Sequence, residues 1–106
     1  MTTNTLFKLQ TEIARHKAER FSTDTYLTLM NDGGIKLDAE DTGPAVKEAW
    51  GRDGEYEYWV DVPPAAVGKL AFELMREKYA GDWEAVDKFR TWCEAHDVEH
   101  KFWTWS

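Results

Sequence analysis

The clearest structural signal in the sequence is the stretch Tyr26-Leu27-Thr28-Leu29-Met30-Asn31-Asp32-Gly33-Gly34-Ile35-Lys36-Leu37-Asp38-Ala39. Its two halves alternate apolar and polar side chains, which is the pattern of a half-buried β-strand. The four residues between the halves, Asn-Asp-Gly-Gly, form a strong turn signal because they tolerate the positive φ angles of tight turns. The stretch therefore predicts a β-hairpin with strands at residues 26–30 and 35–39.

A third strand is predicted downstream, at residues 55–62, where the alternation is clearest. One face of this strand carries Tyr56, Tyr58, Val60 and Val62, and the other carries Glu55, Glu57, Trp59 and Asp61. We expect Tyr58 and Val60 to be buried and the acidic face to meet solvent. Between the hairpin and this strand, Pro44 suits the first position of a short helix over residues 45–50.

Helical periodicity predicts three further segments. A helix is expected at residues 4–21, because Leu6, Leu9 and Ile13 recur at three- and four-residue spacing. Two more helices are expected at residues 65–79 and 83–96. A last strand is expected at residues 100–105, where Phe102 and Thr104 alternate with Lys101, Trp103 and Trp105.

The expected order of elements is α-β-β-(short α)-β-α-α-β. Hairpin-connected strands are antiparallel, and the longer helices follow them along the chain. This order predicts an α+β fold, with a four-stranded, mainly antiparallel sheet and helices packed on one face. The length of 106 residues and the mass of 12.3 kDa suit a single domain over residues 1–106.

The chain is acidic: 13 Lys and Arg stand against 20 Asp and Glu, for a formal net charge of −7. This charge argues against binding to nucleic acid or to an anionic membrane surface, because both attract positive proteins. No apolar run is long enough to cross a bilayer. A single cysteine, Cys93, cannot form an internal disulfide, and Met1-Thr2-Thr3-Asn4-Thr5 does not resemble a secretory signal. We therefore expect a cytoplasmic protein.

The negative charge is concentrated at residues 31–61, which carry nine acids and three bases. A solvated sheet face that keeps a small protein soluble accounts for this pattern. An interaction surface for a basic partner accounts for it too, since like charges on one strand face cost stability. A tryptophan ringed by charge, such as Trp59, is typical of interface anchors unless the helix at residues 4–21 covers it. The candidate partner-binding residues are Asp38, Glu40, Asp41, Glu55, Glu57, Trp59, Asp61, Trp103 and Trp105.

Cys93, His96 and His100 have the spacing Cys-x2-His-x3-His, which could bind zinc. Cys93 beside His96 could also act as a nucleophile. Both residues lie on the apolar stripe of the helix expected at residues 83–96, however, and this position indicates packing in a core. We therefore expect no metal, no other cofactor and no enzymatic activity, and keep a small metal- or cysteine-dependent enzyme as the alternative.

The most distinctive local pattern is Asp41-Thr42-Gly43-Pro44, followed by Glu55-Tyr56-Glu57-Tyr58-Trp59. In size, acidity and order of elements, the chain resembles the small cytoplasmic immunity proteins that bacteria carry against their own toxins. It resembles phage-encoded inhibitors of host defence in the same respects. The resemblance implies a protein that binds and blocks a basic surface of another protein. A homodimer formed through a sheet edge or through the aromatic residues at positions 102–105 is the other binding alternative.

Overall fold

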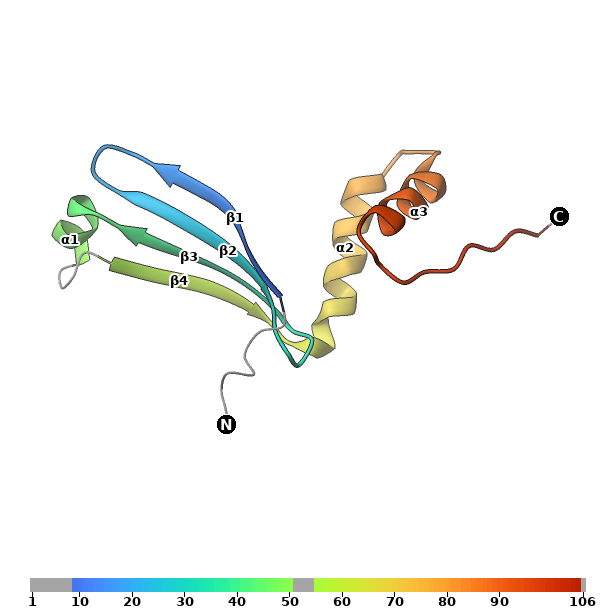
Figure 1. Ribbon diagram of the computed structural model, residues 1–106, viewed down its shortest axis with the longest axis horizontal. Helices are drawn as coiled ribbons and strands as arrows, with labels where there is room; N and C mark the ends of the chain where they lie inside the picture. Colours follow the sequence, from blue (N-terminus) through green and yellow to red (C-terminus); the bar gives the residue numbers. More distant parts are fainter. Residues whose placement is uncertain (1–8, 51–54, 106) are drawn as a thin grey trace. The chain divides into compact units, whose positions relative to one another are not determined.

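The computed structural model describes residues 9–50 and 55–105 of the chain (Figure 1). The strands among them are β1 (Leu9–Lys17), β2 (Ser22–Leu29), β3 (Ile35–Thr42) and β4 (Glu55–Val62). The helices are α1 (Pro44–Trp50), α2 (Val67–Tyr79) and α3 (Ala85–Ala95), and a 3-10 turn, Pro64–Ala66, precedes α2. The chain divides into two compact units, one that ends at Leu70 and one that begins at Ala71.

The first unit is built on a four-stranded antiparallel sheet with strand order β1-β2-β3-β4 (Figure 1). The β2–β3 hairpin confirms the turn chemistry of the sequence: the Met30 N–H donates to the Gly34 carbonyl at 2.8 Å. Gly33 has a φ of 94°, which favours glycine, and the Gly34 N–H donates to Asp32 Oδ1 at 2.8 Å. The α+β class, the hairpin and β4 are therefore confirmed.

Helix α1 confirms the short helix predicted from Pro44, since it begins at that residue. Its Val46 side chain is buried. The helix contacts β3 and β4. The preceding Gly43 has a φ of 122°, and a Cβ atom there would lie 2.7 Å from the Arg20 carbonyl oxygen. The same oxygen accepts a hydrogen bond from the Ala45 N–H at 3.0 Å. Glycine at position 43 thus allows α1 to start directly beside the β1–β2 connection.

The helix expected at residues 4–21 is wrong over its described part, where the chain forms strand β1, paired antiparallel with β2. Leu9 and Ile13 fit both periods, because a spacing of four residues places two side chains on one face of a helix and also on one face of a strand. Hydrogen bonds to β2 select the strand over the helix. Ile13 is the extra, unpaired residue of a β-bulge that follows Glu12. Residues 4–8 of the expected helix lie outside the described residues.

The second unit contains most of α2 and all of α3, close to the two helices expected there. The rings of Tyr79 and Phe89 meet edge to face, with centroids 6.0 Å apart, and Cys93 is buried. Trp83, the first residue of the helix expected at residues 83–96, is 92% exposed and precedes α3. The reason is the local turn, in which Asp82 Oδ1 accepts the Glu84 N–H at 2.9 Å and α3 begins only after it.

The strand expected at residues 100–105 is wrong, since these residues form no strand. A strand requires a hydrogen-bonded neighbour, and alternation alone does not supply one. The segment instead makes a cation–π contact through Phe102, whose ring centroid lies 4.0 Å from Arg90 Cζ. Among the described residues, no helix is both long and apolar enough to cross a membrane.

Candidate functional site

The pairing of β3 with β4 gathers acidic side chains on one face of the sheet. Residues directly opposite each other on antiparallel strands share a face. Asp38 lies opposite Trp59, Glu40 lies opposite Glu57, and Lys36 lies opposite Asp61. We use the term acidic face for Trp59 and the five carboxylates on this side of β3 and β4, which are Asp38, Glu40, Glu55, Glu57 and Asp61.

Trp59 stands at the middle of the acidic face and is 55% exposed. Its indole Nε1–H donates to Asp61 Oδ2 at 3.2 Å. Lys36 Nζ lies 5.3 Å from the centre of the ring, within the range of a cation–π contact. The ring is therefore held between neighbouring side chains while much of its surface stays open to solvent, as expected from the sequence.

Glu40 of β3 lies among several other carboxylates of the sheet. The pKa of Glu40 is raised, first by partial burial of the carboxyl and then by the negative charges of Glu55, Glu57, Asp24 and Asp38. Each neighbouring carboxylate disfavours ionisation of this one, because like charges repel. The raised pKa of Glu40 thus has two causes, the partial burial of its carboxyl and the like charges of its neighbours on β2, β3 and β4.

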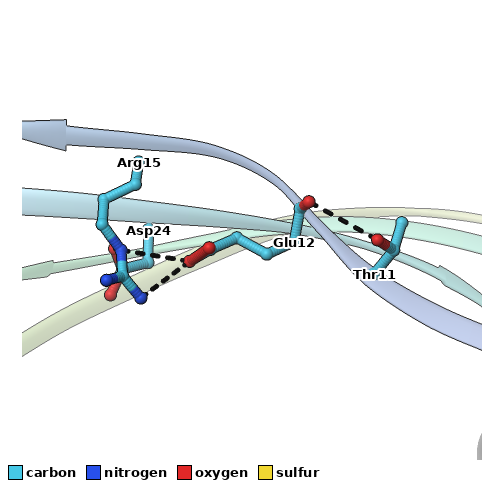
Figure 2. Close-up of polar contacts among 4 residues, drawn as sticks. All are labelled: Thr11, Glu12, Arg15 and Asp24. Carbon is cyan, nitrogen blue, oxygen red and sulfur yellow. Dashed lines mark hydrogen bonds and ion pairs between the residues drawn. The ribbon is translucent and has the colours of Figure 1, made fainter.

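The acids of β1 and β2, in contrast, are neutralised. Figure 2 shows Arg15 of β1 reaching both Glu12 and Asp24, with Arg15 Nε 3.0 Å from Asp24 Oδ1 and Arg15 Nη2 2.9 Å from Glu12 Oε1. The pKa of Arg15 is raised by these two carboxylates, Glu12 first. The same face of the sheet thus carries balanced charge on β1 and β2, whereas on β3 and β4 Lys36 stands against five carboxylates.

Asp41, one of the candidate partner-binding residues, lies on the opposite face of the sheet. It follows Glu40, and successive residues of a strand point to opposite sides. Its Oδ1 accepts hydrogen bonds from Thr23 Oγ1 at 2.6 Å and from the Tyr58 hydroxyl at 3.4 Å. The pKa of Tyr58 is raised by burial and then by the charge of Asp41. The structure therefore separates Asp41 from the acidic face.

The face opposite the acidic face is largely apolar, and the expectation that Tyr58 and Val60 are buried on it is wrong. Tyr58 is 44% exposed and Val60 is 65% exposed. A strand face is buried only by a layer packed over it. In the described part of the first unit, the buried side chains are Thr28, Ala39 and Val46. The apolar side chains that share this sheet face include Leu9, Leu27, Leu29, Ile35, Leu37 and Val62.

The three residues considered for metal binding or catalysis do not converge. Cys93 is 1% exposed and is a free thiol. His96 stacks on Trp92 with ring centroids 4.1 Å apart and donates from Nδ1 to the Trp92 carbonyl at 2.8 Å. His100 donates from Nδ1 to the Val98 carbonyl at 2.8 Å. Among the residues that the structure describes, no group of three His, Cys, Asp or Glu side chains could hold a metal ion.

Trp103 and Trp105 belong to the unit that begins at Ala71, whereas the acidic face belongs to the other. They are 79% and 99% exposed, respectively. The second unit also has an apolar hollow of about 360 Å³, which the sequence did not predict. The hollow is lined by Ala71, Leu74, Met75, Lys78, Tyr79, Phe89, Trp92 and Val98. The apolar stripes of the two helices were visible in the sequence, but their spacing did not show that the stripes leave an open hollow between them.

Comparison with known proteins adds no relative to these observations: no family model, no curated protein and no solved structure matches the chain.

Proposed function

We propose that this chain is a protein-binding domain of the inhibitor or immunity type, whose acidic face engages a basic surface of another protein. The observation that carries the proposal is the exposed Trp59 ring, fixed between Asp61 and Lys36 among five carboxylates. The excess negative charge of the acidic face steers a basic partner to this surface. A rigid, half-exposed aromatic ring then supplies the apolar contact that holds the complex.

The repulsion within the acidic face supports the same proposal. Glu40 lies opposite Glu57, and like charges placed directly across two strands destabilise a sheet. Lysine or arginine side chains of a partner would lie among these carboxylates and replace repulsion with attraction. The arrangement that weakens the free domain would therefore strengthen its complex with a basic protein.

The proposal includes a cytoplasmic location. Cys93 is the one cysteine of the sequence, and its thiol is free and buried. Such a thiol suits a reducing compartment, in which proteins hold their fold without disulfides. The net charge of −7 favours a basic protein partner over nucleic acid or an anionic lipid surface.

The test is site-directed photo-crosslinking with the full chain. A photo-reactive amino acid at position 57 should capture one protein in the producing cells, while the same amino acid in place of Glu94 on α3 should not. The captured protein, once purified, should bind the parent chain at least about tenfold more tightly than it binds a Glu55→Lys, Glu57→Lys variant. Equal affinity for the two chains would contradict the proposal.

A further inference from the structure

The sheet has two edges, and only one of them is suited to receive another strand. β1 and β4 are the edge strands. β1 is interrupted by a bulge after Glu12, which discourages strand addition, and its Arg15 and Lys17 would repel a basic strand. β4 pairs with β3 in an unbroken register from Glu55 to Val62 and contains no proline, and its charged side chains, Glu55, Glu57 and Asp61, are all acidic and would attract a basic strand. Among the described residues, no backbone group of β4 forms a backbone hydrogen bond outside its pairing with β3, so the outer edge of β4 is regular and unpaired.

The segment at residues 99–105 has the composition of a strand but no partner strand, and its Phe102 ring instead contacts Arg90. Aromatic residues favour strands, and Phe102, Trp103 and Trp105 are 47%, 79% and 99% exposed. Within the part of the chain that the structure describes, no hydrogen bond joins a backbone group of residues 99–105 to another backbone group. One chain therefore contains both an open strand edge and an unpaired segment that can extend a sheet.

The two sequences complement each other in one antiparallel register. With Lys101 placed opposite Asp61, Trp103 falls opposite Trp59, and the lysine charge meets the acidic face. On the other side of the same strand, Phe102 falls opposite Val60. Opposite charges, paired aromatic rings and an aromatic residue beside a β-branched one are all stabilising cross-strand pairs. A shift by one residue would move every side chain to the other face and separate the opposite charges.

We propose that two copies of this chain form a dimer by reciprocal strand addition, in which residues 100–105 of each copy pair antiparallel with residues 57–62 of the other. A second copy fits because the donor and the acceptor lie on the same chain, so that a two-fold arrangement of two copies makes the same contact twice and closes the assembly. Main-chain hydrogen bonds supply affinity in such additions, and alternate side chains set the register.

Strand addition brings Trp103 and Trp105 of one copy onto the acidic face of the other. The candidate partner-binding surface is therefore completed by the second copy. This dimer does not depend on the proposed function, because it requires only the purified chain. The first test is sedimentation equilibrium of the full-length protein. We expect a mass about twice 12.3 kDa that falls on dilution.

Charge exchange tests the register. Lys101→Glu and Asp61→Lys should each raise the dissociation constant of the dimer at least about tenfold, and the double variant should recover most of the loss. Lys17→Glu on the opposite edge strand is the matched control and should leave the dimer unchanged. A double variant that dimerises no better than the single variants would overturn the register.

Proline substitutions test the backbone pairing. Strand N–H groups point alternately toward and away from a neighbour, so that one of the variants Trp103→Pro and Thr104→Pro removes a hydrogen bond between copies. Residues 103 and 104 lie outside all helices and strands, and circular dichroism should confirm that each variant keeps its fold. A monomeric parent protein would overturn the proposal. A dimer that both proline variants retain and that Leu37→Asp abolishes would overturn it in favour of contact through the apolar sheet face.

Discussion

Glu40 of β3 lies directly opposite Glu57 of β4, so that two carboxylates share one cross-strand position on the acidic face. On the other side of Glu40, β2 places Asp24 at the same level. The pKa of Glu40 is raised by its partial burial and by the charges around it. A like-charge pair within a small sheet opposes folding, and this pair lies next to the exposed Trp59 on the acidic face.

Neutralising this position should stabilise the free domain. Because the pKa of Glu40 is raised in the folded state, the ionised carboxylate destabilises the fold at neutral pH, and this effect disappears as the pH falls through the raised pKa. Glu40→Gln should therefore increase the free energy of unfolding at pH 7, by about 0.2 to 1 kcal/mol. The gain should shrink on acidification, as followed by thermal melts from pH 7 to pH 4. Glu94→Gln on α3 is the control and should show no such gain.

The charges of the acidic face should control the rate of association with a basic partner. Glu55→Lys with Glu57→Lys should slow association and reduce its dependence on salt, because steering acts at long range and is screened by ions. Stopped-flow mixing at two ionic strengths measures both effects. Glu94→Lys with Glu99→Lys makes the same change in net charge in the other unit and should alter association much less. Equal effects of the two pairs would show that net charge alone is responsible.

Trp59 should control the lifetime of the complex. Trp59→Ala removes an aromatic anchor, and such losses act mainly on the rate of dissociation. We expect dissociation to become faster by at least about tenfold, with association nearly unchanged. The side chain is 55% exposed, so the melting temperature of the free domain should fall only slightly. A variant that fails to fold would show instead that Trp59 belongs to a core.

Replacing a buried valine should cost more unfolding free energy than replacing an exposed one. Val46 of α1 is 6% exposed and Val86 of α3 is 68% exposed. Val46→Ala should cost about 1 to 2.5 kcal/mol of unfolding free energy, by lost transfer energy and a partly unfilled cavity. Val86→Ala should change it by less than about 0.5 kcal/mol. Denaturant titration of both variants measures the difference, and similar costs would contradict the assigned packing.

Cys93 should behave as a packed thiol. It is 1% exposed, so a thiol reagent should label it slowly in the native protein and completely in denaturant. The labelling rate should rise with denaturant in parallel with unfolding, because the thiol becomes accessible when α3 opens. Rapid labelling of the native protein would instead support a reactive cysteine and favour the alternative of a cysteine-dependent enzyme.

Local chemistry was sufficient to predict much of the sheet from the sequence. Residues 31–34 combine turn residues with an alternating flank on each side, and both signals act between neighbours along the chain. Pro44 set the start of α1 in the same local way. Alternation also predicted that Glu55, Glu57, Trp59 and Asp61 share a face, and the acidic face confirms it.

The sequence alone determined the turns, the alternating strands and the concentration of charge, because each depends on residues near one another in the chain. The tertiary structure decided the elements that depend on a partner strand. The residues of β1 satisfy both helical and strand periods, and only hydrogen bonds to β2 select the strand. Residues 100–105 alternate equally well but form no strand, since they have no such neighbour. Strand hydrogen bonds join residues distant in sequence, so the position of Glu40 opposite Glu57 followed from the register and not from spacing.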